Sequence, residues 1–161
     1  MMTKRPSGGL SLGVPSANHL LESDLSRSII SAFYTVYNYF GYGLAESVYS
    51  GALEYELTRR GHTVERELLV QVRYLDRIVA WQRLDMVVDG QVIVENKAVE
   101  RLPPYAARQL LNYLRATRYK IGLLLHFGPE PKVRRFVDFP KRDAPGTVGT
   151  DLKRMRQDET G

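Results

Sequence analysis

The sequence predicts a single mixed α/β domain, and three observations support this fold class. The chain has 161 residues, which is the size of one domain rather than two. Hydrophobic residues make up 43% and charged residues 25% of the chain, so a wholly disordered protein is excluded. Helical and strand-like periodicities follow one another in the order helix, helix, three strands, helix, strand, which predicts a central mixed sheet flanked by helices.

Two helices are predicted in the first part of the chain. Ser23 or Asp24 is a candidate N-cap. Apolar side chains then recur at helical spacing, namely Ile29, Ile30, Phe33, Val36, Tyr37 and Phe40. Residues 41–43 end this helix, and Gly61 is a suitable C-terminal cap for a second one. The apolar stripe of the second helix comprises Val48, Ala52, Leu53 and Leu57.

The middle of the chain has the pattern of three strands. Residues 64–74 are rich in β-branched side chains and alternate between two faces. A turn at residues 75–77 leads to a second strand over residues 78–88. Asp89-Gly90 indicates a hairpin, and the third strand follows over residues 91–98.

A helix and a fourth strand complete the predicted domain. Pro103-Pro104 opens the helix, which runs to Ala116 and carries Leu110, Leu111 and Leu114 as apolar residues. Residues 119–127 have the apolar composition of a buried strand, and Gly128-Pro129 ends it.

The domain is predicted to span residues 23–139. Residues 1–22 are rich in Ser, Gly and Pro and lack periodicity, so we expect a flexible arm. The polar composition of residues 140–161 predicts a weakly ordered tail. No secretory signal is visible and no apolar run reaches the ~20 residues of a membrane helix, so we expect a cytoplasmic protein with no membrane partner.

The positive charge is concentrated in one segment. The chain carries 23 Lys and Arg against 18 Asp and Glu, a net charge of +5. Residues 1–100 are slightly acidic, at −2, whereas residues 101–135 carry +7. This segment is either a solvated surface or a surface that contacts phosphates. On the second interpretation, the candidate nucleic-acid-binding residues are Arg101, Arg108, Arg115, Arg118 and Lys120.

Three charged side chains, Asp85, Glu95 and Lys97, lie within predicted strands. Glu95 and Lys97 are two residues apart and therefore share a strand face. Because buried charges are costly unless they are paired or bind a metal, the set suggests a site for a divalent cation. Oxygen ligands favour Mg²⁺ or Mn²⁺ over zinc. The chain contains no cysteine, which excludes disulfides, thiolate zinc sites and cysteine nucleophiles.

Whether Asp85 joins Glu95 depends on the hairpin turn. A two-residue loop, Asp89-Gly90, places Asp85 on the face opposite to Glu95. A three-residue loop over residues 88–90, with Gly90 in the left-handed conformation, pairs Asp85 with Ile93 and brings Glu95 diagonally next to it. The metal-site hypothesis therefore requires the longer turn.

Three patterns in the sequence resemble a known family. Asp85 and the tripeptide Glu95-Asn96-Lys97 resemble the signature of the PD-(D/E)xK nuclease superfamily. Residues 41–49, with Gly43, Glu46 and Tyr49, are similar to the motif of the small bacterial group named "GxxExxY". Residues 109–113 resemble the Gln-x-x-x-Tyr motif of the RecB-type and phage-exonuclease-like branch of the superfamily. The resemblance covers about residues 24–138 and implies a restriction-endonuclease-like core.

The resemblance also implies roles for individual residues. Asp85 and Glu95 would bind Mg²⁺ or Mn²⁺, and Glu46 would assist the metal site. Lys97 would orient or activate the attacking water. The implied activity is metal-dependent hydrolysis of DNA phosphodiester bonds, in bacterial DNA repair or defence.

The resemblance extends to the last helix and includes two departures. Gln109 and Tyr113 would support the catalytic site or contact the phosphate backbone. Asn96 occupies a position that is usually apolar, so it would need a buried hydrogen-bond partner. His126 stands where the pattern Leu-Leu-Asn-Phe-Gly has Asn.

Other interpretations remain open. Glu46 could have no catalytic role and simply interact with a helix dipole. Asp85 could form a salt bridge with Arg83 or Lys97. The whole chain could be a nucleic-acid-binding module with a degenerate nuclease site. It could also be an interaction protein whose fold mainly supports oligomers. Tyr34, Tyr37 and Tyr39 are more tyrosines than one core face needs, and they could line a self-association surface of a homo-oligomer.

Overall fold

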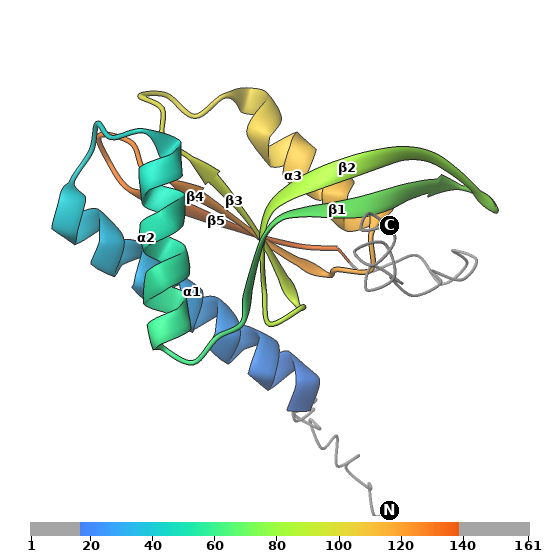
Figure 1. The fold of residues 1–161 in the computed structure, drawn as a ribbon, viewed down its shortest axis with the longest axis horizontal. Coiled ribbons are helices and arrows are strands. Elements are labelled where there is room, and N and C mark those ends of the chain that lie inside the picture. Colours follow the sequence, from blue (N-terminus) through green and yellow to red (C-terminus); the bar gives the residue numbers. More distant parts are fainter. Residues whose placement is uncertain (1–16, 139–161) are drawn as a thin grey trace, which may run out of the picture.

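Two helices from the start of the chain cover one face of a central sheet (Figure 1). The computed structural model describes residues 17–138. α1 spans Ala17–Phe40 and α2 spans Glu46–Arg59. α1 therefore begins earlier than the cap expected at Ser23 or Asp24. The rest of the predicted arm and the predicted tail lie outside the described residues.

The buried stripe of α2 shares Leu53 and Leu57 with the predicted one, but it contains Tyr49 in place of Val48, and Ala52 is only half-buried. Tyr49, Leu53 and Leu57 are fully buried, whereas Val48 is 40% exposed. The stripe follows the i, i+4, i+8 spacing of a single helix face, and Val48 lies beside that face. At the C-terminal end, Gly61 has the left-handed φ of +88°, as its role as a cap requires.

The sheet has the strand order β1-β2-β3-β4-β5. The strands span Val64–Tyr74 (β1), Arg77–Val88 (β2), Val92–Lys97 (β3), Ile121–His126 (β4) and Lys132–Val137 (β5). β3 and β4 are parallel, and every other neighbouring pair is antiparallel. The mixed sheet confirms the predicted fold class.

β5 is a strand that the sequence pattern did not predict. Its six residues include Lys132, Arg134 and Arg135, which hide the strand periodicity, and all three side chains are exposed. The strand lies at an edge of the sheet, beside the fully buried β4. Charged side chains are common on edge strands because they discourage pairing with other chains.

α3, which spans Pro104–Ala116, connects the parallel strands and covers the other face of the sheet. Leu110, Tyr113 and Leu114 pack there with Ile93 and Leu124. The sheet thus has a separate apolar core on each face. Within residues 17–138, none of the helices combines the length and apolar composition that crossing a bilayer requires.

The β1–β2 hairpin bends sharply at its base. Arg66 pairs with Met86 and Leu68 with Leu84, and Glu67 between them has a left-handed φ of +52°. Met86 belongs to the core under α1 and α2, whereas Leu84 belongs to the core under α3. The bend therefore switches the faces of the hairpin and directs its outer half alongside α3 (Figure 1).

Candidate active site

The turn between β2 and β3 decides which side chains meet. Val88 pairs with Val92 and Val87 pairs with Ile93, so the loop comprises residues 89–91. Gly90 has the predicted left-handed conformation, but the predicted position of the loop, residues 88–90, is wrong. Val88 is fully buried and stays in the strand. Continued along the strands, this register places Asp85 opposite Glu95 rather than opposite Ile93.

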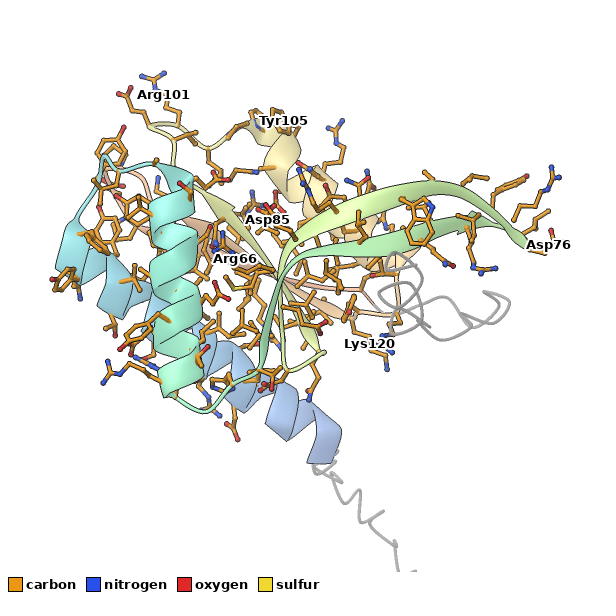
Figure 2. All side chains as sticks on the ribbon, viewed as in Figure 1. Arg66, Asp76, Asp85, Arg101, Tyr105 and Lys120 are labelled. Carbon is orange, nitrogen blue, oxygen red and sulfur yellow. The ribbon has the colours of Figure 1, made fainter. Side chains whose placement is uncertain are left out.

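Asp85, Glu95 and Lys97 form a compact charged cluster at the end of β3. The Lys97 Nζ atom donates a hydrogen bond of 2.7 Å to Glu95 Oε1. Glu95 is only 2% exposed, and Asp85 is half-buried beside it. Asp85 Oδ2 also accepts a hydrogen bond of 3.4 Å from the Asn96 N–H group. Figure 2 shows Asp85 near the centre of the molecule, where the hairpin leaves the sheet.

The environment of this cluster disfavours negative charge on Glu95. Burial raises the pKa of Glu95, and the nearby Asp85 raises it further; although Lys97 lowers it, the resulting pKa is about 7. Burial lowers the pKa of Lys97, but its hydrogen bond to Glu95 and the charges of Glu95, Glu46 and Asp85 raise it above the ordinary value. When Glu95 and Asp85 are both ionised, two carboxylates face one ammonium, and the site then carries excess negative charge.

Glu46 lies at the edge of this cluster. It is the first residue of α2, and its Oε2 atom accepts a hydrogen bond of 3.1 Å from the Ala98 N–H group. Within residues 17–138, no three carboxylate or histidine side chains gather closely enough to hold a metal ion. The pair Asp85 and Glu95 suits Mg²⁺, which is commonly bound by one or two carboxylates while water and phosphate oxygens complete its coordination.

Tyr49 explains the spacing of the Gly43, Glu46 and Tyr49 motif. The Tyr49 hydroxyl donates a hydrogen bond of 2.7 Å to the Gly41 carbonyl and accepts one of 3.2 Å from the Leu44 N–H group. Gly43 has a φ of +115°, which allows the loop to turn toward this hydroxyl. The buried tyrosine therefore holds the loop that places Glu46 at the start of α2.

The two departures from the family pattern have different surroundings. Asn96 is buried, and its Nδ2 atom donates a hydrogen bond of 3.1 Å to Ser50 Oγ, a partner that the sequence did not reveal. His126 Nε2 lies 2.7 Å from the Val99 carbonyl. A side chain at Gly128 would collide with the His126 ring, since a Cβ atom there would lie 2.4 Å from it.

Gln109 and Tyr113 form a second polar cluster. Gln109 Nε2 donates a hydrogen bond to the Tyr113 hydroxyl, and Gln82 Nε2 on β2 donates another of 2.9 Å. Among the described residues, no hydrogen bond joins this cluster to Asp85 or Glu95. The sequence did not single out Gln82, although its position two residues before the buried Leu84 places it on the same strand face.

The candidate nucleic-acid-binding residues are exposed but dispersed. They are Arg101, Arg108, Arg115, Arg118 and Lys120. Arg101 follows β3, at the end of the sheet where Lys97 lies, whereas Lys120 precedes β4 at the other end. Figure 2 shows Arg101 and Lys120 far apart. The structure therefore does not gather all five side chains around the carboxylates.

The tyrosines of α1 have mixed environments. The Tyr37 hydroxyl donates hydrogen bonds to the carbonyls of Gly128 and Pro129, at 2.8 and 3.0 Å. Tyr34 and Tyr39 are exposed. Self-association through these side chains stays a prediction.

Comparison with known proteins adds one finding to this geometry. The family model described as the PD-(D/E)XK nuclease superfamily matches residues 23–136. Neither the curated proteins nor the solved structures include a match to the chain. The matched segment contains the carboxylate and lysine cluster, Glu46 and the polar cluster on α3.

Proposed function

Because the chain belongs to the PD-(D/E)XK nuclease superfamily, we propose that it is a metal-dependent nuclease that hydrolyses DNA phosphodiester bonds. One observation carries the proposal: Asp85 and Glu95 lie side by side, and Lys97 donates to Glu95. The motifs around Glu46 and Gln109 support placing the chain in the "GxxExxY" group and the RecB-type branch.

Each residue of the cluster has a role that its position supports. Asp85 and Glu95 would hold Mg²⁺ or Mn²⁺, and Glu95 would lose its proton to do so. When bound, such a cation supplies Lewis-acid stabilisation of the scissile phosphate and lowers the pKa of water. Lys97 would offset the negative charge of the phosphate and orient the attacking water. Glu46 would keep the Ala98 backbone and the Lys97 ammonium in place.

The proposed substrate also suggests a setting. DNA cleavage by a small bacterial enzyme of this group fits DNA repair or defence in the cytoplasm. Of the five candidate nucleic-acid-binding residues, Arg101 and Arg108 are the closest to the site along the chain; both are exposed and would contact the phosphate backbone.

A titration with Mn²⁺ tests the metal site, and a cleavage assay on DNA tests the activity. We expect Asp85→Asn and Glu95→Gln to weaken Mn²⁺ binding by at least about tenfold and to abolish metal-dependent cleavage. The matched control is Asp76→Asn, because Asp76 is an exposed aspartate at the hairpin tip, far from the cluster (Figure 2). This variant should bind Mn²⁺ and cleave DNA as the wild type does.

Two results would overturn the proposal. One is wild-type protein that does not bind Mn²⁺, or that binds it unchanged in both cluster variants. The other is salt-dependent DNA binding without Mg²⁺- or Mn²⁺-dependent cleavage, which would identify a binding module instead. Circular dichroism spectra of the variants would confirm that they are folded.

A further inference from the structure

A groove lies between α3 and the outer half of the β1–β2 hairpin. Its volume is about 470 Å³, and it is lined by one face of α3 together with Val72 and Gln82 of the hairpin. The α3 residues include Tyr105, Arg108 and Asn112, which follow the i, i+3, i+7 spacing of a helix face. The bend at Glu67 brings the hairpin into this position.

The chemistry of the groove matches an unpaired nucleotide. Tyr105 is 62% exposed and offers a free aromatic face, on which any nucleobase can stack. Asn112 offers an amide with a donor and an acceptor for the edge of a base. The exposed guanidinium of Arg108 can pair with a phosphate.

The Tyr113 hydroxyl adds a directed donor to the floor of the groove. It accepts hydrogen bonds from the amides of Gln82 and Gln109, which occupy both acceptor positions of a phenol oxygen. The hydroxyl hydrogen takes part in neither of these bonds, so the group can still donate to an acceptor on a ligand. Phosphate oxygens and base carbonyls are acceptors of this kind.

The groove lies close to the carboxylate cluster along β2. Gln82 precedes Asp85 by three positions, a distance of about 10 Å along an extended strand. A polynucleotide strand with its phosphate at Asp85 and Glu95 could therefore place a neighbouring nucleotide in the groove. A volume of about 470 Å³ lies within the range of sites that bind small molecules, which matches a single nucleotide.

We propose that this groove binds an unpaired nucleobase next to the scissile phosphate, so that the preferred substrate is single-stranded nucleic acid. The inference rests on the proposed nuclease function and assigns a substrate class to the same site. Trp81 is also exposed, but it pairs with Gln71 and lies on the opposite hairpin face from Gln82, so Tyr105 takes the stacking role.

Fluorescence anisotropy with labelled dT12 and rU12 tests the inference, in a chelating buffer that prevents cleavage. Loss of one stacking contact is worth about 1–3 kcal/mol, so Tyr105→Ala should weaken binding roughly 5- to 150-fold. Tyr105→Phe should restore it, because the phenyl ring keeps the stacking face. Tyr55→Ala is the matched control, since Tyr55 is a similarly exposed tyrosine, at 68%, on α2.

A second readout is an oligonucleotide with 2-aminopurine, whose fluorescence is quenched when the base stacks. The quenching should disappear in Tyr105→Ala and remain in Tyr105→Phe. Weaker binding of dT12 or rU12 by Tyr105→Ala supports the inference. The oligonucleotide that the wild type binds more tightly identifies the preferred sugar.

The inference fails if Tyr105→Ala and Asn112→Ala bind both strands as the wild type does. It also fails if a duplex binds as tightly as the single strands and is equally sensitive to Tyr105→Ala. These outcomes leave the nuclease proposal standing if Asp85→Asn still abolishes cleavage. Conversely, Tyr105-dependent binding without cleavage refutes the nuclease proposal and leaves the groove as a binding site for single strands.

Discussion

At the scale of single residues, Glu95 is the most informative side chain. It is buried, next to another carboxylate, and has a pKa of about 7. A carboxylate in such a place destabilises the metal-free protein when it is ionised. A bound cation would remove that cost, so the same feature that weakens the fold favours metal binding.

The pKa of Glu95 leads to a prediction about stability. A carboxyl group with a higher pKa in the folded state binds its proton more tightly there, so the free energy of unfolding falls as pH rises. For Glu95 the fall lies between pH 4.5 and about 7, and amounts to at most about 3 kcal/mol. Thermal unfolding of metal-free protein between pH 5.5 and 8 should therefore show a decreasing melting temperature.

Two variants isolate the contribution of Glu95 from that of other titrating groups. Glu95→Gln should flatten the pH dependence and make the metal-free protein more stable than the wild type at pH 8. Glu130→Gln removes an exposed carboxylate and should keep the wild-type slope. Equal slopes in the wild type and in Glu95→Gln would contradict the assigned pKa.

At the scale of elements, the bent hairpin connects the site with the groove. Glu67 adopts a left-handed backbone, which costs a non-glycine residue about 1–2 kcal/mol. The position lies between the pairs Arg66–Met86 and Leu68–Leu84, opposite Asp85. Strain of this kind is often found at functional sites, where the surrounding structure maintains it.

A pair of glycine substitutions tests this strain. Glu67→Gly should leave the free energy of unfolding unchanged or raise it by about 1 kcal/mol, because glycine accepts a positive φ without strain. Glu65→Gly, at an exposed position of the same strand, should lower it by about 1 kcal/mol. Chemical denaturation provides the comparison, and equal losses in both variants would show that Glu67 is not strained.

A set of side-chain contacts away from the candidate site joins α1 to the turn between β2 and β3. His62 lies 2.7 Å from Ser28 Oγ through Nε2 and 2.8 Å from Asp89 Oδ2 through Nδ1. The order Ser, His, Asp is that of a hydrolase triad, but Ser28 lies within α1, where backbone N–H groups bond to carbonyls and cannot form an oxyanion hole. We therefore interpret the set as a structural link between α1 and the hairpin turn.

At the scale of the whole molecule, the basic segment is divided between the two ends of the sheet. Lys120 directly precedes β4, whereas His126 is its last residue and pairs with Lys97. Lys120 therefore lies on the order of 20 Å from the cluster along the strand. Arg108 lines the groove and is much better placed to contact a bound strand.

This division predicts how single charges affect binding. A contact with one phosphate of a single strand contributes about 0.7 to the slope of log affinity against log salt. Arg108→Ala should reduce the slope for a short strand such as dT6 by about this amount. Lys120→Ala should leave the slope unchanged, and an equal reduction in both variants would show that the strand follows another path.

The sequence by itself determined the fold class, seven of the eight elements and the charged residues of the candidate site. Periodicity sufficed for this because burial on one face imposes it locally. β5 was missed because Lys132, Arg134 and Arg135 hide the strand periodicity. Val48 was misplaced because neighbouring positions on a helix are hard to separate by spacing alone.

Only the tertiary structure decided how these residues meet. The hairpin register depends on burying Val88, and it sets Asp85 opposite Glu95. The left-handed Glu67 turns the hairpin against α3 and so creates the groove with Gln82 and Tyr105. Both results come from packing between segments far apart in the chain, where the free energy of many contacts outweighs local preference.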